Sequence, residues 1–146
     1  MKTKPTKEKK KKTAIYTIEL ASTRKEVVRV EQFLNGIKKR AKLNDEQFYR
    51  LFIAATEAVT NAIVHGNNCD IRKTVLLKAR ISTRKIVIEV YDQGKGFNPY
   101  NVPNPLDDKN LLKENGRGVF LMKELMDIVE FKSDKKGSKT SMTLRK

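Results

Sequence analysis

The stretch Glu57-Ala-Val-Thr-Asn-Ala-Ile-Val-His-Gly-Asn-Asn68 is the part of the chain that decides its fold. Glu57, Asn61 and His65 are spaced four residues apart, so on an α-helix they form one polar stripe. The residues between them are apolar or small and can pack on a core. The stripe is either a solvated helix face or a set of polar groups that a ligand satisfies. In the second case the carboxylate can accept a proton and the amide oxygen can bind a hard cation.

Composition indicates one soluble domain preceded by a basic tail. The chain has 146 residues, of which 38% are hydrophobic and 34% charged, and its net charge is +15. Residues 1–12 hold seven lysines and one glutamate, which gives +6. We therefore predict a disordered lysine-rich tail over 1–12 and one domain with its own core over 13–146. The tail is either a solvated extension or a contact for nucleic acid or an acidic partner.

Several classes of protein are disfavoured by the same composition. The single cysteine, Cys69, excludes an internal disulfide, and with one histidine in the chain it cannot build a cysteine and histidine metal site. A catalytic pair of Cys69 and His65 is disfavoured because Gly66 is expected to end the helix between them. We find no apolar run of membrane-spanning length and no signal-peptide segment, and no basic motif interleaved with aromatic residues. These features predict a cytoplasmic protein that binds neither membrane nor nucleic acid directly.

Hydrophobic periodicity predicts the order of the elements. Alternation predicts strands, and apolar residues every three or four positions predict amphipathic helices, with Ser22 as the N-cap of the first helix and Leu43-Asn44-Asp45-Glu46 as the capping segment of the second. The strands are expected over 13–20, 74–81, 85–91, 128–133 and 138–144, and the helices from Ser22 to about Arg40, from about Asp45 to His65, and over 119–127. This order suggests an α/β (α+β) two-layer sandwich, with a mixed, largely antiparallel sheet and helices on one face.

Two glycine-bearing segments follow the strands. Asp92-x-Gly94-x-Gly96 places a carboxylate at a strand end, where it can accept a hydrogen bond from an amino group such as that of adenine, while the glycines let the backbone approach a ligand. Gly116-x-Gly118 is expected to open a helix, whose free N–H groups and dipole favour an anion such as phosphate. Residues 100–115 between them are rich in proline, asparagine and aspartate and are predicted to form a mobile lid.

Together the three segments resemble a known family. Glu57-Ala-x-x-Asn61-Ala-x-x-His65-Gly, Asp92-x-Gly94-x-Gly96-Phe97 and Gly116-Arg117-Gly118-x-x-Leu121-Met122 look like the N, G1 and G2 boxes of the GHKL (histidine-kinase-like) ATPases. Within that superfamily the chain most resembles the bacterial anti-sigma-factor serine/threonine kinases. The likeness covers about residues 13–145.

The resemblance implies a role for each matching residue. Glu57 would be the general base and Asn61 would coordinate Mg²⁺ between the phosphates of ATP. Asp92 would bind the adenine amino group, with Gly94 and Gly96 shaping that pocket. The remaining matches are two glycines that let the lid close over the phosphates, an arginine near the γ-phosphate and a threonine that supports the adenine end: Gly116, Gly118, Arg117 and Thr140. His65 could contact the phosphate region or only cap the helix, and Lys95 could be only solvated.

Three functions are compatible with such a domain. The first is an ATP-dependent serine/threonine kinase that sequesters a sigma factor, phosphorylates an anti-sigma-factor antagonist and works as a homodimer. The second is a non-kinase ATP-binding switch that regulates a protein partner. The third is the ATP domain of a sensor histidine kinase, which is disfavoured because the chain lacks a phospho-acceptor helix pair and begins directly at a strand.

Overall fold

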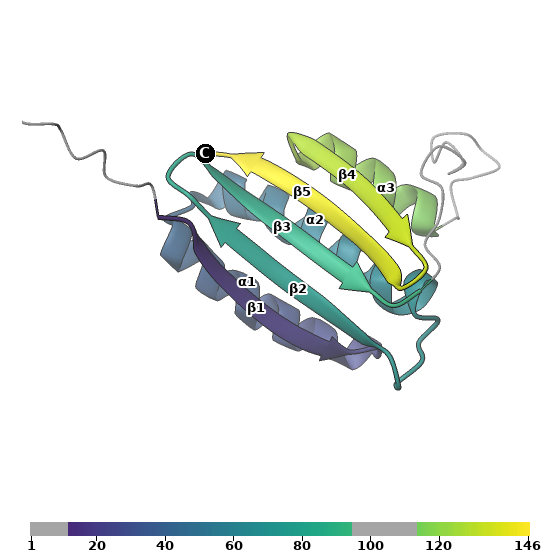
Figure 1. The fold of residues 1–146 in the computed structure, drawn as a ribbon. Coiled ribbons are helices and arrows are strands. Elements are labelled where there is room, and N and C mark those ends of the chain that lie inside the picture. Colours follow the sequence, from purple (N-terminus) through teal and green to yellow (C-terminus); the bar gives the residue numbers. More distant parts are fainter. Residues whose placement is uncertain (1–11, 95–113) are drawn as a thin grey trace, which may run out of the picture.

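The computed structural model describes residues 12–94 and 114–146, which form a sheet with helices on one side (Figure 1). The elements run in the order β1 (Ala14–Ala21), η1 (Arg24–Glu26), α1 (Val27–Ala41), α2 (Asp45–Asn61), η2 (Ala62–Gly66), β2 (Thr74–Ile81), β3 (Lys85–Asp92), α3 (Glu114–Leu125), β4 (Ile128–Asp134) and β5 (Gly137–Arg145). The predicted tail lies almost wholly outside the described residues, as does the predicted lid up to residue 113.

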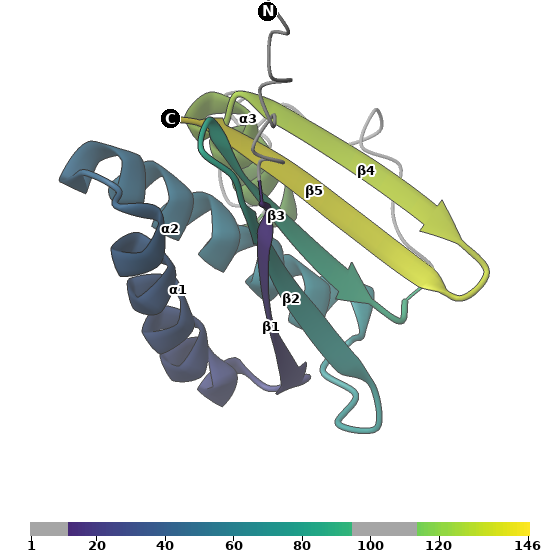
Figure 2. The same cartoon turned by 60° about the vertical axis from the view of Figure 1, so that its left-hand side comes forward.

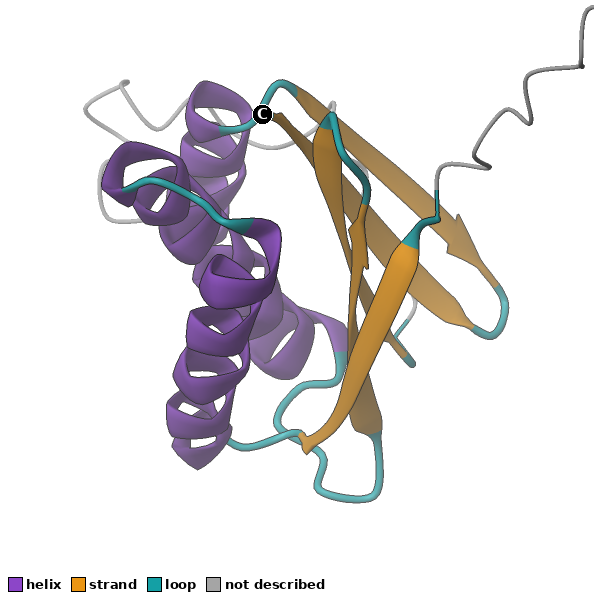
Figure 3. Ribbon diagram, turned by 90° about the vertical axis from the view of Figure 1, so that its left-hand side faces the viewer, coloured by secondary structure: helices purple, strands orange, loops and turns teal. Residues whose placement is uncertain are grey.

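The sheet has five strands in the order β1-β2-β3-β5-β4, and each neighbouring pair is antiparallel. Figures 2 and 3 show the helices stacked on one face of this sheet, with the other face left uncovered. The predicted two-layer sandwich with a largely antiparallel sheet is therefore confirmed. Within residues 12–94 and 114–146, no helix is both long and apolar enough to cross a membrane.

The core lies between the two layers and follows the predicted periodicities. In β2 the burial alternates residue by residue, because successive side chains of a strand point to opposite faces. In α1 and α2 the buried side chains recur every three or four residues and turn toward the sheet. The largest fully buried side chains join both layers: Leu20, Leu34, Ile37, Leu51, Ile63, Leu77, Ile86, Ile88, Met122, Met142 and Leu144.

One predicted helix cap is confirmed and the other is wrong. The Asn44 side chain accepts a hydrogen bond from Gln47 N at 2.8 Å, and the Gln47 side chain accepts one from Asn44 N at 3.0 Å, which completes a capping box for α2. Ser22 does not cap the first helix. Thr23 caps η1, the 3₁₀ turn before α1, by accepting from Lys25 N at 3.1 Å. Ser22 is instead buried, and its hydroxyl donates to Lys73 O at 2.6 Å.

The second helix ends differently from the prediction. The α-helical turns stop at Asn61, and Ala62–Gly66 continue as a π-helical turn, in which Asn67 N donates to Ala62 O at 2.8 Å. The chain then turns through Asn68 and Cys69, whose φ angles are 52° and 54°. Single π-helical turns are uncommon and often lie at functional sites. Here the π-helical turn follows Asn61 directly and ends at Gly66, which lies against Asp92 at the end of β3.

The third helix begins earlier than predicted. It starts at Glu114, so Gly116 and Gly118 lie inside its first turns and do not precede it. Glycine disfavours helix interiors, which is why the sequence pattern placed the boundary after the glycines. Close packing of α3 on α2 explains their presence, as the geometry of the site shows.

Candidate functional site

The polar stripe of α2 faces the glycines of α3. Asn61 is only 7% exposed, and Glu57 is half-buried one turn earlier. A β-carbon added at Gly118 would lie 3.0 Å from Asn61 Nδ2 and 3.0 Å from Glu57 Oε2. The structure therefore brings three of the predicted site residues together, with Gly118 of α3 against the stripe.

The Asn61 side chain has unusual surroundings. Within the part of the chain that the structure describes, neither its amide nitrogen nor its amide oxygen has a hydrogen-bond partner, although both atoms are buried. Buried amide groups are nearly always hydrogen-bonded, because leaving one unpaired costs about 1–3 kcal/mol. A group in this state has its donor and acceptor available for a ligand.

His65, the third member of the stripe, is not buried as Asn61 is. His65 is exposed and lies in the π-helical turn, beyond the regular turns that align Glu57 with Asn61. Arg117 is also exposed, while its neighbours Gly116 and Gly118 are buried. On α3 the glycines therefore face the protein, and Arg117 lies on the solvent side of the same turn.

Asp92 lies at the end of β3 in a pocket walled by glycines. Its Oδ1 accepts a hydrogen bond from Gly94 N at 2.9 Å. A β-carbon at Gly66 would lie 2.5 Å from the Asp92 carboxyl carbon, and one at Gly94 would lie 1.9 Å from Gly66 O. Only glycine fits at these two positions, so the end of the π-helical turn and the loop after β3 press directly on each other.

Burial disfavours the ionised form of this carboxylate. It raises the pKa of Asp92 above its ordinary value, against the opposing hydrogen bonds from the N–H groups of Gly94 and Ser138 and the charge of Lys73. The ionised form of Asp92 is therefore less stable in the folded protein than it would be in water. A ligand that donates a hydrogen bond to Asp92 would relieve that cost.

Other predicted site residues occupy neighbouring positions. Thr140 lies on β5, paired with Val90 of β3 and Phe131 of β4, and it is half-buried. It is two residues from Ser138, the register partner of Asp92. Gly96 and Lys95 lie outside the described residues.

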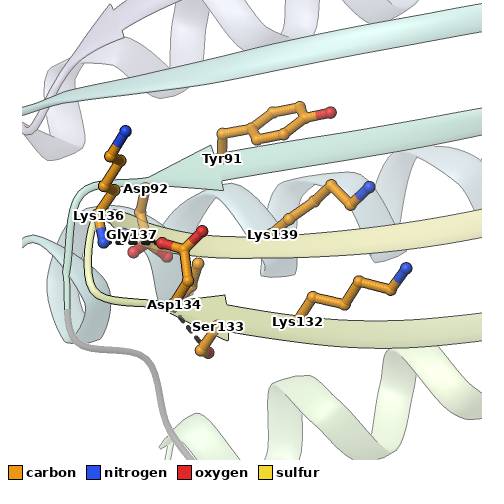
Figure 4. Close-up of a pocket in the computed structure, with 9 residues that line it drawn as sticks. Tyr91, Asp92, Lys132, Ser133, Asp134, Lys136, Gly137 and Lys139 are labelled. Carbon is orange, nitrogen blue, oxygen red and sulfur yellow. Dashed lines mark hydrogen bonds between the residues drawn. The ribbon is translucent and has the colours of Figure 1, made fainter.

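A hollow on the uncovered face of the sheet borders the same strand ends (Figure 4). It measures about 640 Å³ and is lined by Tyr91, Lys132, Lys139 and the turn between β4 and β5. Of the described site residues, Asp92 alone borders it. Tyr91 faces this hollow, whereas the Asp92 carboxylate faces Gly66 in the helical layer. The hollow and the Glu57–Asn61 stripe are thus on different sides of the sheet.

Comparison with known proteins places this geometry in a family. A profile described as the histidine kinase-like ATPase domain matches residues 20–144. The chain belongs to the histidine kinase-like ATPase family. The match spans Glu57, Asn61, Asp92, Gly118 and Thr140, so all of these site residues lie within the family's domain.

Individual relatives agree with this assignment. An anti-sigma F factor of Clostridium perfringens is 40% identical over 100 residues, which cover 66% of this chain and 71% of the relative. The serine-protein kinase RsbW of Bacillus licheniformis is 33% identical over 119 residues, covering 75% of this chain and 72% of the relative. The RsbU and RsbW domains of a Mycobacterium tuberculosis protein share the fold, with a TM-score of 0.67 at 16% identity over 90% of this chain and 32% of that one.

The residues present fit the nucleotide and metal that this ATPase family implies. Mg²⁺ is usually held by one or two protein oxygens together with phosphates and water, and the unpaired amide oxygen of Asn61 can supply such a ligand. No group of three or more metal-binding acidic, histidine or cysteine side chains occurs among residues 12–94 and 114–146. A metal shared with phosphates needs no such group.

Sequence reasoning missed the residues that join these parts. Asn67 was predicted only to follow the helix end, yet it is fully buried and hydrogen-bonded to Ser22, Thr74 and Gln93. The available signal was the run Gly66-Asn67-Asn68, since asparagine after a glycine commonly bonds nearby backbone groups. That signal does not identify partners 26 or 45 residues away.

Proposed function

We propose that this chain is an ATP-dependent serine/threonine protein kinase that also acts as an anti-sigma factor, with ATP and Mg²⁺ as cofactors. The observation that carries the proposal is the buried, unpaired amide of Asn61 beside Glu57, where α3 approaches. The names of the two sequence relatives, an anti-sigma F factor and a serine-protein kinase, support the choice of activity.

On α2, Glu57 and Asn61 have different roles in the reaction. Asn61 binds Mg²⁺ through its amide oxygen, and Glu57 takes the proton from the attacking serine or threonine hydroxyl. Bound Mg²⁺ supplies neutralisation of the phosphate charge. Both residues lie on α2, whose buried side chains pack into the core, so the helix fixes the relative placement of the two groups.

The end of β3 recognises the base. The Asp92 carboxylate accepts a hydrogen bond from the adenine amino group, and Gly94 and Gly96 allow the base to approach the backbone. Thr140 supports the same end from the adjacent strand β5. The raised pKa of Asp92 agrees with this role, because an amino donor compensates the ionised carboxylate for its lost water.

The start of α3 binds the phosphates of ATP. Gly118 brings the first turns of this helix close to α2, Gly116 is buried beside it, and the N–H groups and dipole at the helix start favour negative charge. Arg117 is on the exposed side of that turn, and we assign it to the γ-phosphate. Phosphoryl transfer depends mainly on such positioning and charge stabilisation.

The partners follow from the proposed activity. In this account a sigma factor is the sequestered partner, an anti-sigma-factor antagonist is the phosphorylated one, the protein is a homodimer and the compartment is the cytoplasm. The domain itself extends over 13–146, with residues 1–12 as an appended basic tail.

A pulldown from the native cell with and without Mg-ATP, followed by phosphosite mapping of the captured proteins, tests the proposal. We expect a captured protein that becomes phosphorylated on serine or threonine when ATP is present. If partners are captured in a nucleotide-dependent way but never phosphorylated, the chain is a nucleotide-gated switch and not a kinase.

A further inference from the structure

The buried side chain of Asn67 joins the two halves of the site. Its Nδ2 donates to Thr74 O at 3.0 Å and to Ser22 Oγ at 2.9 Å, and its Oδ1 accepts from Gln93 N at 2.8 Å. The side chain is 0% exposed, and every polar atom of it is used. These partners also fix its orientation, since the carbonyl of Thr74 requires a donor and the N–H of Gln93 requires an acceptor.

The hydrogen bonds close into a ring. Thr74 N donates to the side chain of Gln93 at 2.7 Å, so Asn67, Thr74 and Gln93 each bond to the other two. Ser22 extends the ring to Lys73 O at 2.6 Å. Four segments are thereby fixed to one another: the residue after β1, the end of the π-helical turn, the start of β2 seven residues further along, and the residue after β3.

This ring of hydrogen bonds lies directly beside Asp92. Gln93 N belongs to the peptide that directly follows Asp92, and the next N–H, that of Gly94, donates to Asp92 Oδ1. On its other side Asn67 N bonds to Ala62 O, the residue next to Asn61. Asn67 therefore links the peptide that follows Asp92, through its side chain, to the backbone of the π-helical turn that follows Asn61, through its N–H.

We propose that Asn67 is a positioning residue that sets how the Asp92 carboxylate is presented to the nucleotide base, and thereby makes the site select adenine over guanine. The proposal rests on the proposed function, in which Asp92 binds the adenine amino group. Guanine has a carbonyl oxygen where adenine has this amino group. A carboxylate held in one orientation therefore accepts from adenine and repels guanine, whereas a loosely held one can turn away.

The test measures binding of ATP and of GTP, each with Mg²⁺, by isothermal titration. For Asn67→Ala we expect the preference for ATP over GTP to fall by roughly tenfold or more, as loss of a buried hydrogen-bonded group predicts. In a phosphotransfer assay the KM for ATP should rise while kcat at saturating ATP stays within about threefold of wild type, because Asn67 contacts no reacting atom. Asn68→Gly is the matched control: Asn68 is exposed and has a φ of 52°, which glycine adopts freely, so the preference should not change.

A second variant covers the case in which Asn67→Ala does not fold. Ser22→Ala removes the hydroxyl that accepts from Asn67 Nδ2 and leaves the bonds of Asn67 to Thr74 O and Gln93 N in place. This variant should fold and lose a smaller part, about two- to fivefold, of the ATP preference. A folded Asn67→Ala, or failing that a folded Ser22→Ala, with the wild-type ratio of ATP to GTP affinity would overturn the inference.

The same titrations separate this inference from the proposed function. If wild type has no preference for ATP, or if Asp92→Ala retains that preference, the assignment of Asp92 to adenine is wrong and the inference is wrong with it. If Asp92→Ala loses the preference while Asn67→Ala keeps it, only the role of Asn67 is contradicted.

Discussion

At the scale of single residues, the charge of Asp92 lowers the stability of the free protein but favours binding of the adenine amino group. Burial raises its pKa, so the charge that is suited to an amino donor is costly in the folded protein without a ligand. For a carboxyl with a raised folded pKa, this cost is present above that pKa and disappears as the pH falls through it. Buried residues with a shifted pKa are typical of ligand-binding and catalytic sites.

We therefore predict that Asp92→Asn stabilises the free protein at neutral pH while it weakens ATP binding. Asparagine keeps the size of the side chain and an oxygen for Gly94 N, and it removes the buried charge. Thermal unfolding should give a higher Tm for the variant at pH 7, and the difference should shrink as the pH falls toward 3.8, the ordinary pKa of aspartate. A lower Tm at pH 7, or a difference independent of pH, would contradict this account of Asp92.

At the scale of the elements, the contact between α2 and α3 depends on a missing side chain. Gly118 faces Asn61 and Glu57 so closely that a β-carbon would be 3.0 Å from a side-chain atom of each, and these side chains would have to shift by a few tenths of an ångström. Alanine would favour the helix by its intrinsic propensity, but it would separate α3 from the stripe.

The prediction is that Gly118→Ala lowers Mg-ATP affinity by roughly tenfold or more, the expected effect of a strained contact of 1–3 kcal/mol. Gly36→Ala is the control, because Gly36 lies in α1 and a β-carbon there would have no atom within 4 Å. That change should leave ATP binding as it is and stabilise the protein by about 0.5–1 kcal/mol. Titration and denaturant unfolding of both variants measure the two effects, and equal ATP affinity in both would exclude the proposed approach of α3.

The elements also show what the sequence could predict. Alternation in β2, the neighbouring positions of Glu57 and Asn61 on α2 and the helix cap within residues 43–46 are local patterns, and the structure has them where they were expected. Ser22 was mistaken for a cap because its bonding partners, Asn67 and Lys73, lie 45 and 51 residues away. Gly116 and Gly118 were placed before their helix because propensity alone disfavours them inside it. Local patterns predict elements, whereas long-range hydrogen bonds and close packing decide how those elements meet.

At the scale of the whole molecule, the basic charge is divided between tail and domain. Residues 1–12 contribute +6 of the net +15. None of the residues that build the described site lies in that segment, and β1 begins after it, at Ala14.

We accordingly predict that deleting residues 1–12 leaves folding and phosphotransfer unchanged, within about twofold in kcat/KM. The full-length protein is the reference, assayed at the same ionic strength because a change of charge alters screening. A truncated protein that unfolds at the same Tm but no longer transfers phosphate would show that the tail takes part in catalysis.

The central claim is that the whole protein transfers phosphate through a base on Glu57 and a metal on Asn61. Glu57→Gln keeps the size of the side chain and removes the proton acceptor, while Asn61→Ala removes the metal ligand.

The most direct measurement pairs Mg-ATP titration with phosphotransfer to the serine or threonine of a purified antagonist. Glu57→Gln should bind Mg-ATP nearly as wild type does and transfer phosphate about 10²–10⁴-fold more slowly, whereas Asn61→Ala should lose Mg-ATP binding itself. Full kinase activity in Glu57→Gln would contradict the claim, because it would show that Glu57 is structural and does not act as the base.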